Sequence, residues 1–170
     1  MKILLALLLA STQFLQPLSA SPQTTRTDPV LVRSVIDGDT IDVERFGRVR
    51  LLGIDAPEMG RGFDTTAPFA REARDKLISL VLRHYVRLEN DQRGDARDTY
   101  NRHLAYVVRE DGLVVNTELV REGLARVTAR ARLVRLDELK RAEAEAQSLQ
   151  RGIWGSLPGI PSPRYTRPSP

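Results

Sequence analysis

The chain has 170 residues, of which 41% are hydrophobic, and its formal net charge is +4. This length allows one domain with tails and a small, mainly aliphatic core, because only 5% of the residues are aromatic. The absence of cysteine excludes a disulfide framework and a lipid-anchored cysteine. Most of the positive charge is arginine, which favours a partner rich in phosphate over a merely soluble basic protein.

Residues 1–20 have the pattern of a secretory signal. Lys2 supplies a positive charge ahead of an apolar run over residues 3–10, which is too short to span a bilayer. Small residues end the segment, and we expect cleavage after Ala20. The sequence therefore predicts a secreted or periplasmic protein without a membrane-spanning segment in the mature chain. A buried N-terminal helix is disfavoured, because polar residues 21–29 follow and predict a flexible leader.

Three short strands are expected after the leader, and the second and third form a hairpin. Gly47 supplies the hairpin turn. Asp37 and Gly38 predict a turn between the first two strands. Gly53, inside the third strand, indicates a bulge or a close backbone approach, and Pro57 ends that strand. The three expected strands are residues 30–35, 40–46 and 48–54.

Three helices and two more strands are expected in the rest of the chain. The first helix begins at a Thr66 cap and has Pro68 in its first turn. Asn116 caps a short second helix that Gly123 ends, and Asp137 caps the third. The apolar stripe of the third helix is Leu139, Ala142, Ala146 and Leu149. The two strands are residues 85–89 and 104–108, and residues 124–127 are extended.

This order of elements predicts the fold class. Five short strands with one helix between the third and the fourth match an α+β fold, a five-stranded OB-type Greek-key β-barrel with three helices. We expect this domain to cover residues 30–155 and Trp154 to pack on its core. Residues 156–170 are rich in proline and lack a periodic pattern, which predicts a disordered tail. OB barrels often bind nucleic acids, but a fold alone does not fix a function.

Charged side chains gather at the outer ends of the expected hairpin. Because the hairpin folds back on itself, Asp39 should lie near Asp55, with Glu58 just beyond and Arg50 close by. Carboxylate oxygens suit a hard cation such as calcium or magnesium, and arginine suits a phosphate. A divalent cation, an arginine and a spare carboxylate can together hydrolyse a phosphodiester. Taken alone, each short motif is also a plausible turn or strand end.

Taken together and in this order, the motifs resemble those of staphylococcal nuclease-type (thermonuclease-like) enzymes. The resemblance spans about residues 31–154 and implies an OB barrel with three helices. It also implies a calcium-dependent phosphodiesterase that acts on DNA and RNA and leaves 3′-phosphate and 5′-hydroxyl ends. We further expect the protein to be a monomer. The matching segments are residues 36–40, 50–58, 98–106, 114–127 and 152–154.

The resemblance implies a set of calcium ligands. Asp39 and Asp55 are expected to bind the metal through their carboxylates, and Ala56 through its backbone carbonyl. The family often has threonine at this last position, but a carbonyl ligand survives the change to alanine. Asp37 is expected to support the water molecules on the metal. Two carboxylates, one carbonyl and waters can satisfy the flexible coordination of calcium.

The resemblance also implies the catalytic and substrate-binding residues. Glu58 is expected to hold or deprotonate the attacking water. Arg50 and Arg102 are expected to grip the phosphate and stabilise the negative charge that develops in the transition state. Tyr100 is expected to hydrogen-bond a substrate phosphate. These groups neutralise an anionic substrate before hydroxide attacks it.

Two departures from the family pattern affect substrate binding. The family has a lysine beside the tyrosine where this chain has Thr99, so one phosphate contact is expected to be lost. The family tyrosines after the second helix are replaced by Ala129 and Ala131, which weakens stacking on a base. Arg130 and Arg132, in the same run, are candidate phosphate contacts. This arginine run is equally well explained as a solvated face.

Two other classes of function are weaker explanations of the sequence. A non-catalytic OB module that binds nucleic acid has no use for the whole cluster of carboxylates and arginines. A structural or partner-binding protein accounts for the proline-rich tail but not for the cluster. His84 and His103 lack the spacing of metal ligands, and Tyr106 is expected to belong to the core.

Overall fold

A computed structural model describes residues 25–60, 65–91, 96–128 and 133–155. Residues 1–24 and 156–170 lie outside the described residues, so the predictions of a signal segment and a disordered tail stay predictions. Arg130 and Arg132 lie outside them as well. Within the described residues, no helix is both long and apolar enough to cross a membrane.

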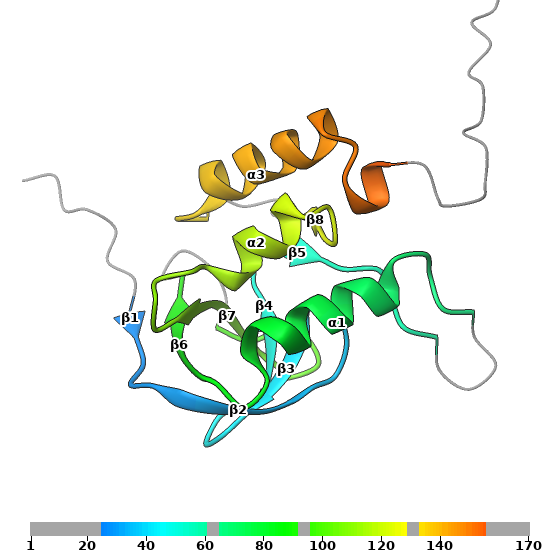
Figure 1. Ribbon diagram of the computed structural model, residues 1–170. Coiled ribbons are helices and arrows are strands. Elements are labelled where there is room, and N and C mark those ends of the chain that lie inside the picture. The colour runs from blue at the N-terminus through cyan, green and yellow to red at the C-terminus, as the bar shows by residue number, and fades with distance from the viewer. Residues whose placement is uncertain (1–24, 61–64, 92–95, 129–132, 156–170) are drawn as a thin grey trace, which may run out of the picture.

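Five strands form a closed, mixed barrel, which confirms the predicted OB-type α+β fold (Figure 1). The strands are hydrogen-bonded in the order β6-β2-β3-β4-β7, and β7 also pairs with β6, which closes the barrel. The β4–β7 pair is parallel, and the other pairs are antiparallel. The barrel strands are β2 (Val30–Val35), β3 (Thr40–Val43), β4 (Gly47–Leu51), β6 (Tyr85–Asn90) and β7 (His103–Arg109).

Three shorter strands lie outside the barrel ring. β1 (Thr25–Arg26) pairs with β6, so these residues of the expected leader lie in a sheet. β5 (Ile54–Asp55) pairs with β8 (Arg126–Val127) in a separate two-stranded sheet. The third predicted strand is therefore split into β4 and β5, and Gly53, with φ of 79°, lies at the break. Its left-handed conformation suits glycine and turns Asp55 away from the barrel.

The hairpin that positions the site turns slightly earlier than predicted. Residues 44–46 form the turn, Arg45 takes a left-handed φ of 67°, and Gly47 opens β4 with φ of 70°. Positive φ at these two positions reverses the chain within a short turn. In the ladder that follows, Thr40 faces Arg50 and Asp42 faces Arg48.

The three predicted helices are present, but their predicted caps are wrong. α1 (Ala70–Val81) begins after Phe69, α2 (Val115–Arg121) after Val114, and α3 (Leu136–Ser148) after Arg135, and none of these residues makes a side-chain cap hydrogen bond. Thr66 instead accepts a hydrogen bond from the N–H of Gly60 at 3.3 Å. Asp137 lies in the first turn of α3 rather than before it.

Asn116 ties α2 to the barrel instead of capping it. Its side-chain oxygen accepts a hydrogen bond from the N–H of Val107 at 2.9 Å. Its amide nitrogen donates to the carbonyl of Leu52 at 3.0 Å and to that of Ala105 at 3.4 Å. Asn116 is fully buried, so these bonds satisfy an amide that would otherwise be costly to bury. They hold α2 against β7 and against Leu52, the residue after β4.

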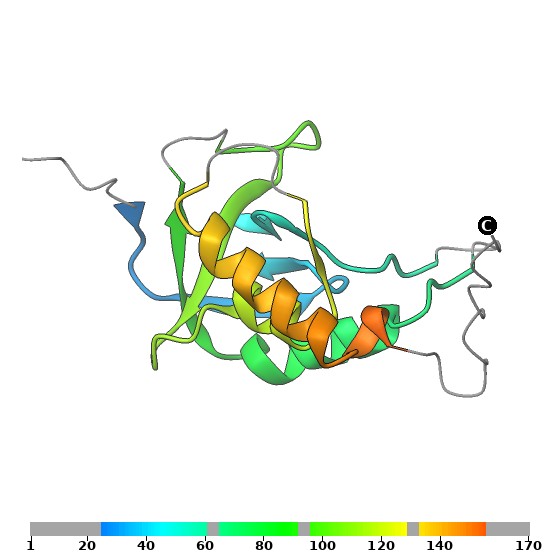
Figure 2. The ribbon, with the colours of Figure 1, turned by 90° about the horizontal axis from the view of Figure 1, so that it is seen from above.

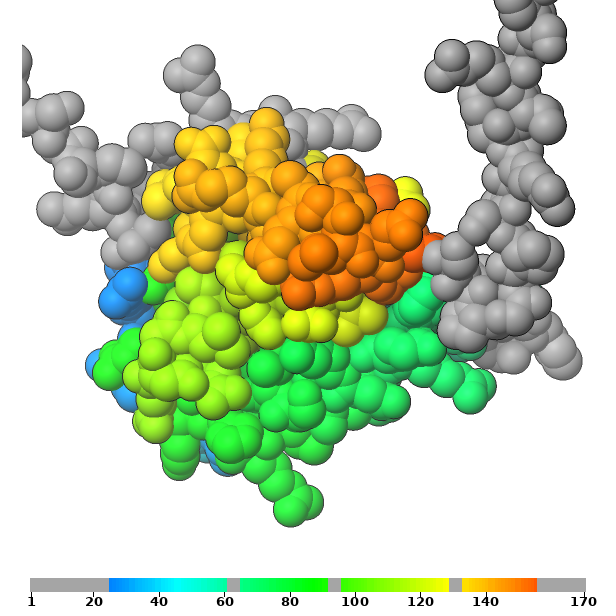
Figure 3. Space-filling view, turned by 45° about the horizontal axis from the view of Figure 1, so that its top comes forward, coloured from blue at the N-terminus to red at the C-terminus, as the bar shows by residue number. Residues whose placement is uncertain are grey.

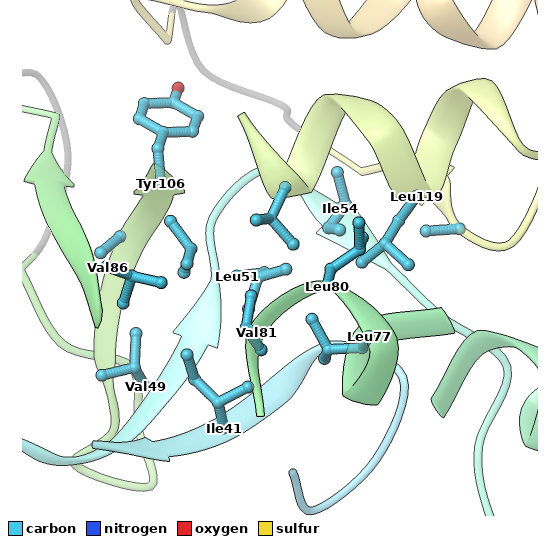
Figure 4. Close-up of a cluster of buried hydrophobic side chains, with 14 of the residues drawn as sticks. Ile41, Val49, Leu51, Ile54, Leu77, Leu80, Val81, Val86, Tyr106 and Leu119 are labelled. Atoms are coloured by element: carbon cyan, nitrogen blue, oxygen red, sulfur yellow. The ribbon is translucent and has the colours of Figure 1, made fainter. Parts of the chain in front are cut away.

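The core fills the barrel and continues under α1 and α2 (Figure 4). Tyr106 is fully buried, as predicted. α3 packs on the outer side of α2 and covers it, as Figures 1–3 show. Leu149 was expected on the buried stripe of α3, but it follows the helix and is 55% exposed. Trp154 is only half-buried, with the Arg126 guanidinium 5.1 Å above its ring, rather than packed in the core.

Candidate active site

The hairpin brings Asp39 and Asp55 together, as predicted, and Arg50 joins them. The Arg50 guanidinium contacts Oδ1 of Asp39 with one terminal nitrogen. Its other terminal nitrogen lies 2.5 Å from Oδ1 of Asp55 and 3.4 Å from the carbonyl oxygen of Ile54. The ladder accounts for this meeting, because Thr40 faces Arg50 and so places Asp39 beside the same strand.

Asp39 is the enclosed carboxylate of the pair. Its Oδ2 accepts the N–H of Ala56 at 3.0 Å, and its Oδ1 accepts the Thr40 hydroxyl at 3.0 Å. Burial raises the pKa of Asp39, and the charge of Arg50 and the Ala56 hydrogen bond act against this rise. The Ala56 bond links Asp39 to the start of the segment that carries Glu58, so the two ends of the hairpin are fixed to each other.

Arg50 and Asp55 are the more open members. Burial alone lowers the pKa of Arg50, but its pairs with Asp39 and Asp55 outweigh burial and raise that pKa. The guanidinium therefore stays charged at any pH at which the protein folds. Asp55 is about half exposed, with 52% of its side chain accessible. The cluster thus has a buried side at Asp39 and a solvent-facing side at Asp55.

The turn before Asp39 depends on a glycine that the packing requires. A Cβ on Gly38 would lie 2.7 Å from the Cβ of Ala56 and 2.8 Å from that of Ala73. Only glycine lets the turn lie this close to α1 and to the Ala56 segment. Within the turn, Oδ1 of Asp37 accepts the N–H of Asp39 at 3.1 Å. Asp37 therefore supports the backbone that presents Asp39.

Arg102 is held at the site by a short loop before β7. Asp98 accepts its side-chain Nε–H at 2.6 Å and its backbone N–H at 2.9 Å. Partial burial opposes ionisation of Asp98, but these bonds and the N–H of Tyr100 outweigh it and lower the pKa of Asp98. Arg102 also donates to the hydroxyl of Thr40 at 3.3 Å, which brings it to the hairpin. Its guanidinium lies 5.4 Å from the ring centre of Tyr100.

An open cavity of about 550 Å³ joins the remaining predicted residues. Asp37, Glu58, Tyr100 and Arg102 all line it. Glu58 and Tyr100 are exposed, the latter by 80% of its surface. The sequence did not single out the other lining residues. These are Arg48, Met59, Gly60, Thr65 and Ala67.

Two residues with supporting positions were also missed as individual members of the site. Thr40 contacts both Asp39 and Arg102, and Asp98 fixes Arg102. Both lie in segments that the sequence did single out, but no spacing rule distinguishes a supporting residue from a turn residue. His103 is outside the group: it contacts Arg97, and burial and that positive charge lower its pKa.

The oxygen atoms at the site fit a hard divalent cation. Asp39, Asp55 and the carbonyl of Ala56 offer only oxygen, which is the donor type that calcium and magnesium take. Among the described residues, no three His, Cys, Asp or Glu side chains form a metal-binding group. A cation here therefore draws its other ligands from carbonyls, waters or substrate. Such a small protein donor set suits either calcium or magnesium.

An OB-type barrel with a carboxylate and arginine cluster beside an open cavity defines a class of phosphodiesterases. Comparison with known proteins identifies the family. The sequence model of the staphylococcal nuclease homologue family matches residues 48–156 of this chain. The chain belongs to this family, and it is a nuclease that acts on nucleic acid rather than a non-catalytic binding module. Enzymes of the family need a metal ion.

Individual relatives agree with this assignment. The chain is 35% identical to a thermonuclease of Staphylococcus intermedius over 146 residues, which cover 81% of this chain and 83% of that protein. It is 35% identical to a thermonuclease of Staphylococcus hyicus over 126 residues, 72% of this chain and 73% of that one. It is 38% identical to endonuclease YncB of Bacillus subtilis over 130 residues, 74% and 61% of the two chains.

Proposed function

We propose that this protein is a secreted or periplasmic, calcium-dependent nuclease that hydrolyses both DNA and RNA and leaves 3′-phosphate and 5′-hydroxyl ends. The observation that carries the proposal is the bridge from Asp39 through Arg50 to Asp55, next to a cavity lined by Glu58 and Arg102. The residues are those expected from the sequence for metal binding, phosphate binding and water activation.

Asp39 and Asp55, with the Ala56 carbonyl, would hold the metal. When bound, calcium would neutralise phosphate charge and act as a Lewis acid on a phosphoryl oxygen. Asp37 would keep Asp39 in place through the backbone hydrogen bond described above. Asp55 faces solvent, so it is the member of the set that is open to an incoming cation.

Arg50 and Arg102 would bind the phosphate that is cleaved. Both guanidinium groups are charged donors on the same side of the hairpin, and each is positioned by a carboxylate. Donors fixed in advance stabilise charge that develops in the transition state without having to reorganise. Glu58 is exposed in the same cavity, where it would orient and deprotonate a water. Tyr100 would hydrogen-bond a phosphate.

The test is digestion of supercoiled plasmid and of a single-stranded RNA by the purified protein. Calcium, magnesium and excess chelator are compared, and the ends of the products are analysed by mass spectrometry. We expect cleavage of both substrates with calcium, little with magnesium and none with chelator, and 3′-phosphate ends. Undiminished cleavage in chelator would remove the metal from the reaction, and 5′-phosphate ends would reverse the assignment of the leaving group.

Glu58→Gln separates the proposed base from the proposed metal ligands. The substitution removes the base but keeps the size of the side chain, so turnover should fall while calcium binding, measured by titration calorimetry, persists. Wild-type turnover in this variant would require another group to activate the water.

Export and assembly are proposed on the sequence. Mass spectrometry of the exported protein should show an N-terminus near Ser21, and retention of Met1 would contradict a cleaved signal. Light scattering should give the mass of one chain, because we expect a monomer.

A further inference from the structure

A second arginine lies on the strand that carries Arg50. β4 has alternating burial: Val49 and Leu51 are buried in the barrel, whereas Arg48 and Arg50 lie on the outer face. Residues two apart on one face of a strand are separated by about 6.5–7 Å along it. Arg48 is thus one step from Arg50 toward the hairpin turn, and it lines the same cavity as Glu58 and Arg102.

The charge of Arg48 is not used by the fold. Its neighbour across the ladder is Asp42, but among the ion pairs and hydrogen bonds within the described part of the chain, none engages the Arg48 guanidinium. Its side chain is exposed, and burial of the strand depends on Val49 and Leu51 instead. Within the described residues, Arg48 thus lacks the carboxylate contacts that hold Arg50.

Arg102 supplies one positive charge beside Tyr100 in this cavity. The neighbouring Thr99, exposed on the loop before β7, adds no charge there. Arg48 and Tyr100 line the same cavity from different elements, β4 and that loop. Arg48 thus adds a second positive charge to the cavity, from the strand rather than from the loop.

We propose that Arg48 binds the phosphate next to the one that is cleaved, on the Tyr100 side of the site, and so selects longer strands over minimal substrates. Arg50 and Arg102 hold the reacting phosphate, and Arg48 offers a planar pair of donors to its neighbour. The inference rests on the proposed role of Arg50, because it orders the two phosphates along β4. It assigns Arg48 a substrate-binding role in specificity and no part in the chemical step.

The test compares Arg48→Gln with Arg48→Lys, which keeps the charge, and with Arg83→Gln as a matched control. Arg83 is exposed at the end of α1 and does not line the cavity. Cleavage is measured on a dinucleoside monophosphate, which has one phosphodiester and no neighbouring phosphate, and on a short single-stranded DNA oligonucleotide. Binding of the same oligonucleotide is measured by fluorescence anisotropy in chelator across a salt series.

For Arg48→Gln we expect the loss in kcat/KM to be about tenfold larger on the oligonucleotide than on the dinucleoside monophosphate, as for one lost charged hydrogen bond. The loss should be in KM. The slope of log K against log salt should fall by about 0.7, the value for one single-strand phosphate contact. Arg48→Lys should restore most of this slope, and Arg83→Gln should match the wild type.

Equal losses on the two substrates, or an unchanged salt slope, would overturn the proposal. An equal effect of Arg83→Gln would also overturn it, because the losses would then reflect the general positive charge of the surface. Failure of the wild type to cleave either substrate would contradict the proposed function instead, and the anisotropy series would still decide whether Arg48 binds a phosphate.

Discussion

Asp39 and Glu89 are buried carboxylates that pair with arginine, and they lie in different surroundings. Asp39 pairs with Arg50 at the hairpin. Glu89, on β6, is fully enclosed and lies 2.7 Å from Arg135 and 2.5 Å from Arg26. In each case the negative charge of a carboxylate and the positive charge of a guanidinium compensate each other in a site that is largely shielded from solvent.

The partners of the two pairs show how they differ. Arg135 also binds Glu138 at 2.8 Å and lies over the ring of Tyr106, so its contacts join β6, β7 and α3. Arg50 instead extends the Asp39 pair to the half-exposed Asp55. A buried ion pair is therefore not a mark of an active site by itself. What distinguishes the hairpin is the open cavity next to it, with charged groups that the fold leaves available.

Glu89→Ala should give the largest effect on stability and spare the chemistry. It removes a fully buried carboxylate and leaves Arg135 with only Glu138, and breaking a buried pair costs about 3–5 kcal/mol. Urea unfolding measures the loss, and activity per folded molecule should match the wild type. A loss below about 1 kcal/mol would show that the Glu89 pair is energetically like a surface pair.

Arg50→Ala should impair the chemistry, besides the stability that it loses by leaving the buried Asp39 unpaired. Activity should fall by about 10²-fold or more, as when an electrostatic donor to the transition state is removed. Steady-state cleavage of plasmid, corrected for folded fraction, measures this loss. Arg26→Ala is the matched control, because Arg26 also pairs with a buried carboxylate but lies at Glu89. Equal losses of activity in the two variants would remove the distinction between the two regions.

Asp98→Asn should have a smaller effect, which is on the pH dependence of stability. The variant should lose less stability in acid than the wild type does. The folded-state pKa of Asp98 is lowered, so its contribution to stability is present above the unfolded pKa and is lost as the pH falls through the folded pKa. Urea unfolding between about pH 5 and pH 2 should therefore show a shallower decline in the variant. An unchanged decline would mean that the Asp98–Arg102 pair forms equally in the unfolded chain.

Arg130→Ala/Arg132→Ala should give the smallest effect, confined to substrate binding. If both arginines contact phosphates of a single strand, the slope of log K against log salt should fall by about 1.4, which is twice the value for one contact. Oligonucleotide binding without calcium measures it. An unchanged slope and affinity would assign the run to a solvated face.

The barrel could be predicted from the sequence because each strand has its own signal. The alternation of apolar Ile41 and Val43 with polar Asp42 and Glu44, together with Gly47, indicates the hairpin without tertiary information. The helix caps could not be predicted in this way. Asn116 has the chemistry of a cap, but bonds to Val107, Leu52 and Ala105 outweigh local capping, and these partners are distant in the sequence.

The site was predictable where it follows from strand pairing and less so where it depends on loops. Asp39 and Arg50 meet because of the hairpin register, and Asp55 follows four residues after β4. Arg102 is fixed locally by Asp98, but its contact with Thr40 needs β7 to lie beside the hairpin. The position of Arg48 in the cavity had a signal, its two-residue spacing from Arg50, but that spacing acquires meaning only once Glu58 and Tyr100 line the same space.

The central claim is that the cluster of Asp39, Arg50 and Asp55, at its half-exposed Asp55 end, is the metal-dependent catalytic centre. The substitution Asp55→Asn tests this claim most directly. Asp55 is exposed enough that its replacement by the amide of the same shape should leave the fold intact, which urea unfolding confirms independently. We predict that calcium-dependent plasmid cleavage by the folded variant falls by at least about 10²-fold. Cleavage at the wild-type rate by folded Asp55→Asn would contradict the account.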